Sequence, residues 1–177
     1  MLGGRWDLHK ELVRAMTRGV LLGGNVYVVR DRGSRRIVSV GFWLEPGQSI
    51  FGSEEQRALG FNTFFRKLSP DAQYWWNNTY PDTMRELRET VWTGDEMKRR
   101  WWCSHLATHP EQQGRGFATA IVDYAYDDSV AMGQFLGLAT QQELNVRKYE
   151  AMGFRERGRT LMPAPTGDFP VIVLSKT

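Results

Sequence analysis

Apolar residues near the start of the chain are spaced first as in a helix and then as in β-strands. Their spacing of three and four over Trp6–Arg18 predicts a helix, which Gly19 would end. Two runs of β-branched and aromatic residues, NVYVVRD at 25–31 and RRIVSVGFWLE at 35–45, predict a hairpin turned by the DRGS segment. Gly41 in the second run indicates a bulge.

The middle of the chain, residues 53–98, has a helical but irregular pattern. Pro70 and Pro81 are expected to break it, which leaves predicted helices over Glu54–Lys67 and Asp82–Val91. No internal repeat or low-complexity tract interrupts the chain.

The C-terminal half alternates strands and helices. Strands are predicted over 100–110 and 134–140, then a helix over 142–152 and two more strands over 153–162 and 169–174. The helix between the first two strands has the clearest apolar face, made of Phe117, Ile121, Tyr124, Ala125 and Met132. This order favours an α/β (α+β) fold, in which a strand-helix-strand unit forms a parallel pair and the last two strands return antiparallel.

Composition narrows the class of protein. With 177 residues the chain is long enough for one core, so a single domain over 1–177 is expected. The 23 Lys and Arg residues against 20 Asp and Glu are scattered, which gives no indication of nucleic-acid binding. The lone Cys103 excludes an internal disulfide, and no spacing predicts a metal site. Without an apolar stretch of membrane-spanning length or a secretory start, a soluble cytoplasmic protein is expected, with no membrane partner.

The stretch HPEQQGRGFATA, residues 109–120, leads into the long helix and contains two glycines and several small residues. The first amides of a helix have no partner inside it, and glycines let a ligand approach them closely. A diphosphate would fit there, with Arg115 adding charge. The stretch matches neither the Walker pattern nor the dinucleotide fingerprint, and a glycine-rich helix start is common in itself.

A second motif, NVRKYEAMGF at 145–154, lies one strand further on. Asn145 and Tyr149 are four residues apart and share a helix face, while Gly153 suits a left-handed helix end. Together with Gln113–Ala118, these residues resemble the acetyl-CoA signature of the GCN5-related N-acetyltransferases, the GNAT superfamily. The phrases also look like its small-molecule branches, both the antibiotic-modifying, puromycin N-acetyltransferase-like branch and the fungal branch.

The resemblance implies a GNAT fold, a mixed and mostly antiparallel sheet with a central parallel strand pair flanked by helices. It implies an acetyl-CoA-binding core at about 101–154 and an acceptor side at about 53–98. Family members begin with a strand and two helices, whereas this chain has room for one helix before its hairpin. Either the first strand is absent or the start is misread. An absent strand would leave Val26–Arg30 as an open edge, or as an edge paired in a homodimer.

The same resemblance implies roles for individual residues. Tyr149 would be the general acid for the departing thiolate, and Asn145 would orient the pantetheine or a water. The pantetheine would bind along the strand that contains Leu106, Ala107 and Thr108. The residues expected to hold the pyrophosphate are Gln113, Gly114, Arg115, Gly116, Phe117, Ala118 and Thr119. Tyr149 and Asn145 also have simpler interpretations. Tyr149 could be a core aromatic, and Asn145 could be a helix cap.

The general base is the least constrained role. His105 is the chosen candidate because it lies on the expected cofactor strand and its imidazole titrates near neutral pH. It could equally be a histidine that packs or faces solvent, and Glu45 and Asp71 are rival bases. Cys103 alternates with His105 and is expected to face the same side of the strand, most simply as a small buried hydrophobe.

The acceptor is expected to be a small-molecule amine. Five of the seven tryptophans fall within 75–102, and Trp75, Trp76, Trp101 and Trp102 are interpreted either as core or as the wall of an apolar acceptor pocket. The leading hypothesis is therefore acetyl transfer from acetyl-CoA, a co-substrate, to such an amine, with no metal. The alternatives are a CoA-binding module without activity and a protein N-acetyltransferase.

Overall fold

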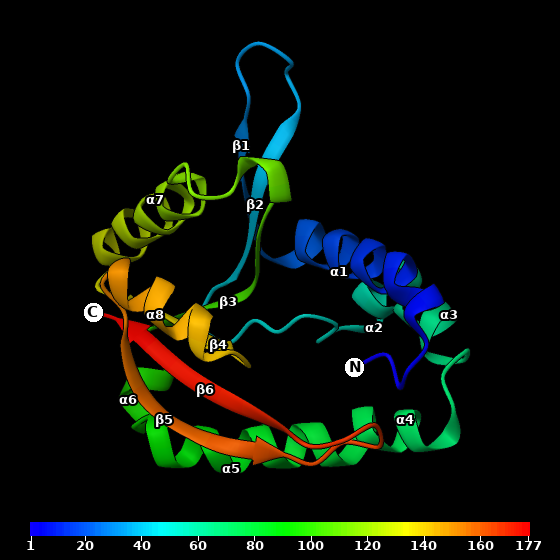
Figure 1. Ribbon diagram of the computed structural model, residues 1–177. Coiled ribbons are helices and arrows are strands. Elements are labelled where there is room, and N and C mark those ends of the chain that lie inside the picture. The colour runs from blue at the N-terminus through cyan, green and yellow to red at the C-terminus, as the bar shows by residue number, and fades with distance from the viewer.

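A six-stranded mixed sheet forms the centre of the computed structural model, which describes residues 1–177 (Figure 1). The strands are β1 (Asn25–Arg30), β2 (Ile37–Leu44), β3 (Arg100–Thr108), β4 (Phe135–Thr140), β5 (Arg155–Met162) and β6 (Phe169–Lys176). Their order across the sheet is β1-β2-β3-β4-β6-β5, and only β3 and β4 pair in parallel. The predicted mixed, mostly antiparallel sheet with a central parallel pair is thus confirmed.

Helical segments connect the strands. The helices are α1 (His9–Gly23), α2 (Glu54–Gln56), α3 (Asn62–Phe65), α4 (Pro70–Tyr74), α5 (Tyr80–Val91), α6 (Gly94–Met97), α7 (Phe117–Ala131) and α8 (Glu143–Ala151). Short 3-10 turns lie at Trp6–Leu8 and Pro110–Gln112, and π-helical segments at Arg57–Phe61 and Trp75–Thr79. None of these helices combines the length and the apolar character that crossing a bilayer requires.

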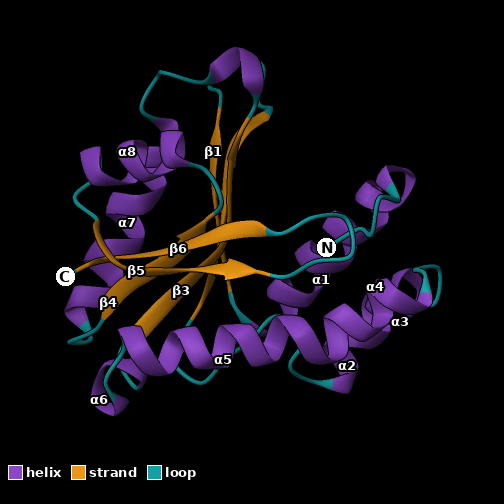
Figure 2. Cartoon of the chain, turned by 60° about the horizontal axis from the view of Figure 1, so that its bottom comes forward, coloured by secondary structure: helices purple, strands orange, loops and turns teal.

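The helices form a layer on each face of the sheet (Figure 2). Along β6, Ile172 and Leu174 pack with α7 and α8, whereas Val171 and Val173 pack with α5 on the other face. This alternation is the period of two that a strand buried on both sides requires. A third cluster joins α1 to Phe51, α3 and α4 over the β2 end of the sheet.

Helix α1 extends beyond the end predicted at Gly19. Gly19 is buried inside the helix, and a Cβ there would lie 3.5 Å from the ring of Phe51. The fully buried Val20 continues the apolar face one residue further. Close packing therefore outweighs the weak helix preference of glycine, and the helix ends at Gly23.

The predicted break at Pro81 is also wrong. Helix α4, the π-helical segment and α5 follow one another without interruption from Pro70 to Val91. A proline inside an α-helix lacks an amide and clashes with the carbonyl four residues earlier. Here that carbonyl belongs to Asn77 in the wider π-helical segment, which accommodates the ring.

The bulge expected at Gly41 lies elsewhere. Gly41 pairs regularly with Tyr27 and Leu106, and its missing side chain serves close packing, because a Cβ would lie 2.6 Å from Ile121 of α7. The register between β2 and β3 shifts at Ser104 instead, since Phe42 pairs with His105 and Trp43 with Cys103. Because of the bulge, each residue of β3 after Ser104 faces the side of the sheet opposite to the one that regular alternation would give it.

Helix α7 turns a slightly different face to the sheet than its sequence suggests. Ile121 and Ala125 are buried as expected, and Val122 joins them, but 58% of Tyr124 and 52% of Met132 is exposed. Tyr124 lies at the sheet edge, edge-on to Tyr27 of β1 at 5.0 Å. Strand β1 is that edge: it pairs with β2 alone, and only a 3-10 turn and α1 precede it.

Candidate functional site

The two parallel central strands, β3 and β4, separate partway along their length. Their pairing ends at Cys103 with Leu138, although β3 continues to Thr108. The free edge of β3, the start of α7 and the face of α8 enclose a groove of about 690 Å³. The amide and carbonyl groups of a strand edge without a partner are available to a ligand.

Every residue predicted as catalytic or cofactor-binding lines this groove, with the exception of Arg115. The residues brought together are His105, Leu106, Ala107, Thr108, Gln113, Gly114, Gly116, Phe117, Ala118, Thr119, Asn145 and Tyr149. Gln112, Lys148, Ala151 and Met152 also line the groove; they lie within the two motifs, but the sequence assigned them no role. Lys148 and Met152 lie three and seven residues after Asn145, so the spacing of a single helix face was the signal that could have found them.

The start of α7 has the geometry of an anion site. Gly114 and Gly116 have φ angles of +75° and +79°, and no heavy atom lies within 4 Å of where their Cβ atoms would be. The first bond of the helix runs from the Ala120 amide to the Gly116 carbonyl, and no side chain caps the end. The amides of Phe117, Ala118 and Thr119 therefore face the groove end without helical partners.

Arg115 does not itself line the groove, but it contacts two residues that do. Its guanidinium donates to the side-chain carbonyl of Gln112 and lies 5.0 Å from the centre of the Phe117 ring. The guanidinium is therefore held by side chains at the rim of the groove.

Tyr149 and Asn145 enter the groove from α8. Tyr149 is partly buried and packs edge-on to Phe154 at 5.8 Å, and this burial, with the nearby Cys103 thiol, raises the pKa of its phenol. A raised pKa keeps the hydroxyl protonated at neutral pH. Asn145 is not the helix cap, since Gln142 occupies that position.

The bulge at Ser104 separates two residues expected on the same side of β3. Cys103 belongs to the core beneath α7 and α8, where burial raises the pKa of its thiol to about 12. His105 lies instead over Phe42 on the other face, with 5.8 Å between ring centres. Burial, and secondly His9 of α1, lowers the pKa of His105. The expectation that both face the same side is wrong, because the extra residue inverts the alternation.

The rival bases lie outside the groove. The carboxylate of Glu45 accepts a hydrogen bond of 2.9 Å from the Asn25 side chain beyond the end of β2. Asp71 is exposed on α4. Among the three candidates, only His105 borders the groove.

The four tryptophans do not form one cluster. Trp101 is buried beneath α7 and α8, whereas Trp75 is buried on the opposite face of the sheet with α5. Trp76 and Trp102 are partly buried on that second face, between the α1 and α5 clusters. Trp75 and Trp101 are thus core residues, and Trp76 and Trp102 remain candidates for an acceptor wall.

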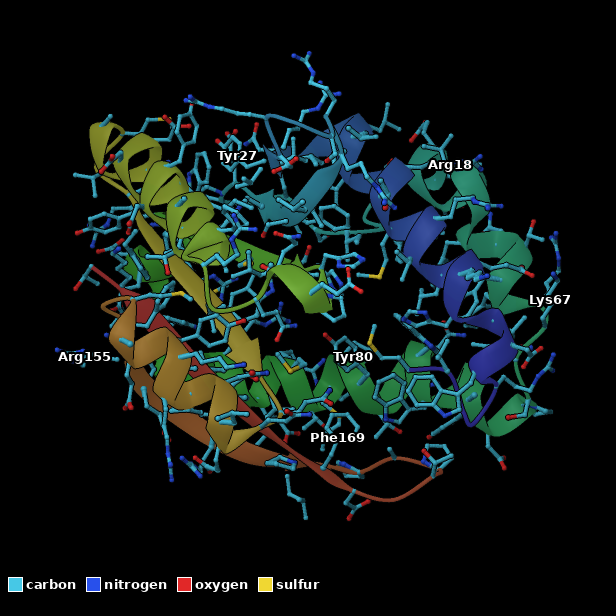
Figure 3. The ribbon with its side chains drawn as sticks, turned by 45° about the horizontal axis from the view of Figure 1, so that its top comes forward. Arg18, Tyr27, Lys67, Tyr80, Arg155 and Phe169 are labelled. Atoms are coloured by element: carbon cyan, nitrogen blue, oxygen red, sulfur yellow. The ribbon has the colours of Figure 1, made fainter.

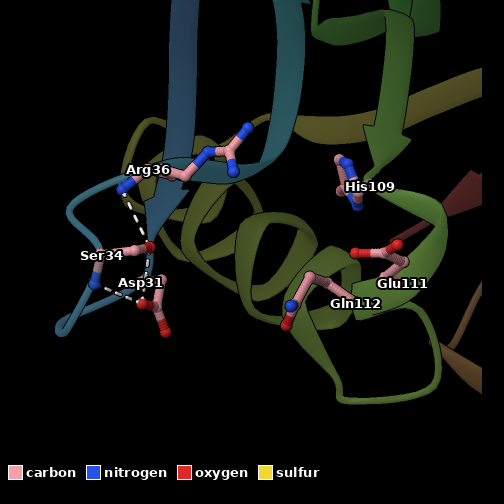
Figure 4. Close-up of a pocket in the computed structure, with 6 residues that line it drawn as sticks. All are labelled: Asp31, Ser34, Arg36, His109, Glu111 and Gln112. Atoms are coloured by element: carbon pink, nitrogen blue, oxygen red, sulfur yellow. Dashed lines mark hydrogen bonds between the residues drawn. The ribbon is translucent and has the colours of Figure 1, made fainter.

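A second, smaller cavity of about 310 Å³ lies between the hairpin tip and the loop after β3 (Figure 4). Its lining is polar throughout and consists of Asp31, Ser34, Arg36, His109, Glu111 and Gln112. Asp31 already accepts two hydrogen bonds of 2.8 Å from Ser34, one from its amide and one from its hydroxyl. These bonds are those of the hairpin turn itself.

Known structures share this fold. A Corynebacterium glutamicum protein described as histone acetyltransferase HPA2 and related acetyltransferase is 16% identical, with a TM-score of 0.57 over 96% of this chain and 74% of its own. A putative streptothricin acetyltransferase from Bacillus anthracis, in complex with acetyl coenzyme A, is 9% identical (TM-score 0.52, 87% and 62% covered). An N-acetyltransferase from Staphylococcus aureus is 11% identical (0.52, 85% and 68%).

No curated protein matches the sequence. The model of the acetyltransferase (GNAT) family, however, matches residues 42–154, which is more than half of the chain. That segment includes β3, the glycine-rich start of α7, and α8, the three elements that enclose the groove. The chain therefore belongs to the GNAT family of acetyltransferases.

Proposed function

We propose that the protein transfers the acetyl group of acetyl-CoA to the amine of a small molecule. The observation that carries this proposal is the groove itself, in which an open strand edge meets a row of unpaired helix amides. Gly114 and Gly116 leave space for the pyrophosphate to reach those amides, and Lys148 on the opposite wall adds a positive charge. The backbone of β3 from Leu106 to Thr108 would hold the pantetheine.

Bound there, acetyl-CoA supplies the thioester whose acetyl group is transferred. The amine nitrogen forms a bond to the carbonyl carbon, and the bond from that carbon to sulfur breaks. Tyr149 donates its proton to the departing thiolate, a role that its raised pKa suits because the phenol stays protonated. An amide of β3 between Leu106 and Thr108 stabilises the oxyanion, an effect worth about 3 kcal/mol elsewhere.

His105 takes the proton of the attacking amine. Its lowered pKa keeps the imidazole neutral at pH 7, so it can accept a proton directly or through water. It borders the groove while its ring packs on Phe42, on the face of the sheet opposite α7 and α8. The acceptor would therefore approach from the face that carries α1 and α5, where Trp76 and Trp102 are partly buried.

Two measurements test this function. Acetyl-CoA at 100 times its dissociation constant should raise the free energy of unfolding by about 2.7 kcal/mol, and thiol release over a panel of small amines should detect turnover. No stabilisation at millimolar acetyl-CoA would overturn the binding and the transfer together. Stabilisation without turnover of any amine would favour the CoA-binding module, and turnover of peptides alone would favour a protein acetyltransferase.

A further inference from the structure

Arg100, a partly buried arginine without a salt bridge, lies on the face of β3 that carries α5. Arg100 is sandwiched between aromatic rings, with its guanidinium carbon 4.6 Å from the ring centre of Trp102 and 5.4 Å from that of Trp92. Its Nε and Nη1 atoms are shielded from solvent and have no hydrogen-bond partner. The Nε1 atom of Trp92 is likewise buried without a partner. Several N–H donors thus meet where the protein offers no acceptor.

The surrounding charges increase this imbalance. Arg88 of α5 is close enough to contribute, after burial, to the lowering of the Arg100 pKa to about 10. Arg88 forms no salt bridge, so it does not bring a carboxylate to the cluster. Arg157 also lies over Trp92, at 5.0 Å, but Glu96 pairs with it at 2.7 Å. An unpaired buried charge is costly, whereas a bound anion would satisfy both the charge and the open donors.

The side chain of Arg100 points toward the groove end of the strand. Arg100 pairs in register with Phe135, yet its Cγ and Cδ lie 3.1 and 2.9 Å from where a Cβ of Gly137 would be. Gly137 is level with Trp102, two residues further along β3. The absence of a side chain at Gly137 makes room for the arginine to run along the sheet. Trp102 pairs with Leu44 and His105 with Phe42, so across the bulge the two residues are only two steps of β2 apart, about 7 Å of strand.

We propose that Arg100, assisted by Arg88, binds a carboxylate on the amine acceptor, so that the enzyme prefers amines that carry a carboxylate about 7 Å from the nitrogen. Trp102 would form the wall between the two ends of the acceptor, and Tyr80 projects from α5 on the same side of the sheet (Figure 3). That the ligand is the acceptor rests on the proposed acetyltransferase function, whereas the anion site itself does not depend on that function.

The test compares straight-chain aminoalkanoic acids of increasing length with their primary amides as acceptors. In the wild type, kcat/KM for the acid should exceed that for the amide by roughly tenfold to a hundredfold at the length that fits, the range of a charge-assisted hydrogen bond. Arg100→Met should bring the ratio close to one by lowering the value for the acid alone. Arg157→Met is the matched control, because it removes a cation over the same ring that Glu96 already neutralises, and it should keep the ratio.

Binding is measured separately with alkanoic acids that lack the amine. These should raise the unfolding midpoint of the wild type and of Arg157→Met, but not of Arg100→Met. If Arg100→Met does not unfold cooperatively, Arg88→Gln replaces it and should lower the ratio several-fold. A wild type that acetylates amines without preferring acids at any length, or a preference that survives both substitutions, would overturn the anion site. Stabilisation by the acids without turnover of any amine would uphold the site and overturn the transferase function.

Discussion

A methyl group added at the start of α7 should weaken acetyl-CoA binding in addition to its cost to the fold. Gly116 has a φ of +79°, lines the groove, and has no heavy atom within 4 Å of the added Cβ. Gly133 is a matched control with a φ of +68°, the same open surroundings, and a position beyond the other end of the helix. In both Gly→Ala variants the left-handed backbone should lower the free energy of unfolding by about 1 to 2 kcal/mol.

Only the Gly116 methyl group would stand between the helix amides and a bound pyrophosphate. Losing one hydrogen bond to a charged group costs about 1.5 to 3 kcal/mol, which raises the dissociation constant roughly tenfold to a hundredfold. At a concentration of 100 times the wild-type dissociation constant, acetyl-CoA stabilises the wild type by about 2.7 kcal/mol. The Gly116→Ala variant should then gain between about 1.4 and 0.4 kcal/mol.

The assay is denaturant unfolding with and without acetyl-CoA, in the wild type and both variants. Each variant then serves as its own reference, because the cost of the backbone strain cancels between the two conditions. Gly133→Ala should keep the full ligand stabilisation. Equal stabilisation of Gly116→Ala and Gly133→Ala would refute the assignment of the pyrophosphate to the amides at the start of α7.

Four further outcomes follow from the groove and from the core beside it. Tyr149→Phe should lower kcat by about 10² to 10⁴ with an unchanged acetyl-CoA dissociation constant, and a kcat within a few-fold of wild type would remove Tyr149 from the acid role. Because the pKa of His105 is lowered, the acid limb of kcat/KM should lie below about pH 6.5 and disappear in His105→Gln; a limb that survives this substitution belongs to another group. The same lowered pKa means that the folded state disfavours the charged imidazole. The free energy of unfolding should therefore fall as the pH drops from about 6.5 through the folded pKa of His105. Thermal melts should show this loss in the wild type but not in His105→Gln. Cys103, with a pKa of about 12 in the core, should resist alkylation near about pH 8 until the chain is unfolded.

Local patterns in the sequence predicted the structure correctly where a residue type is favoured by one particular backbone conformation. The glycines of the α7 start lie in the left-handed region that their sequence context suggests, and Gly153 does so at +91° after α8. The alternation of strands and helices from Arg100 onward was also predictable, because each element buries an apolar face of its own. The order of the elements then follows from a parallel pair that needs a helical crossover.

The middle region was predicted poorly because its helices are not regular. The π-helical segment at Arg57–Phe61 contains Gly60 at a φ of +138°, and the wider turns move the next apolar residues out of phase with a period of 3.6. The paired capping contacts at Ser53 and Thr93 begin α2 and α6, yet α6 spans only Gly94–Met97, too short for a periodic signal. Arg100 was missed for a different reason, since its lack of a partner depends on contacts from α5, β4 and the segment around Trp92.

The bulge at Ser104 decides which side of β3 each candidate residue serves. Without it, Cys103 and His105 would share a face and would lie together beneath α7 and α8. With it, Leu106 returns to the core beside Cys103, while His105 continues the face of Arg100 and Trp102. A single inserted residue therefore places the candidate base His105 on the face of the sheet opposite α7 and α8, whereas Tyr149 belongs to α8. Since the register of a strand pair depends on its partner, no pattern within β3 alone could reveal this division.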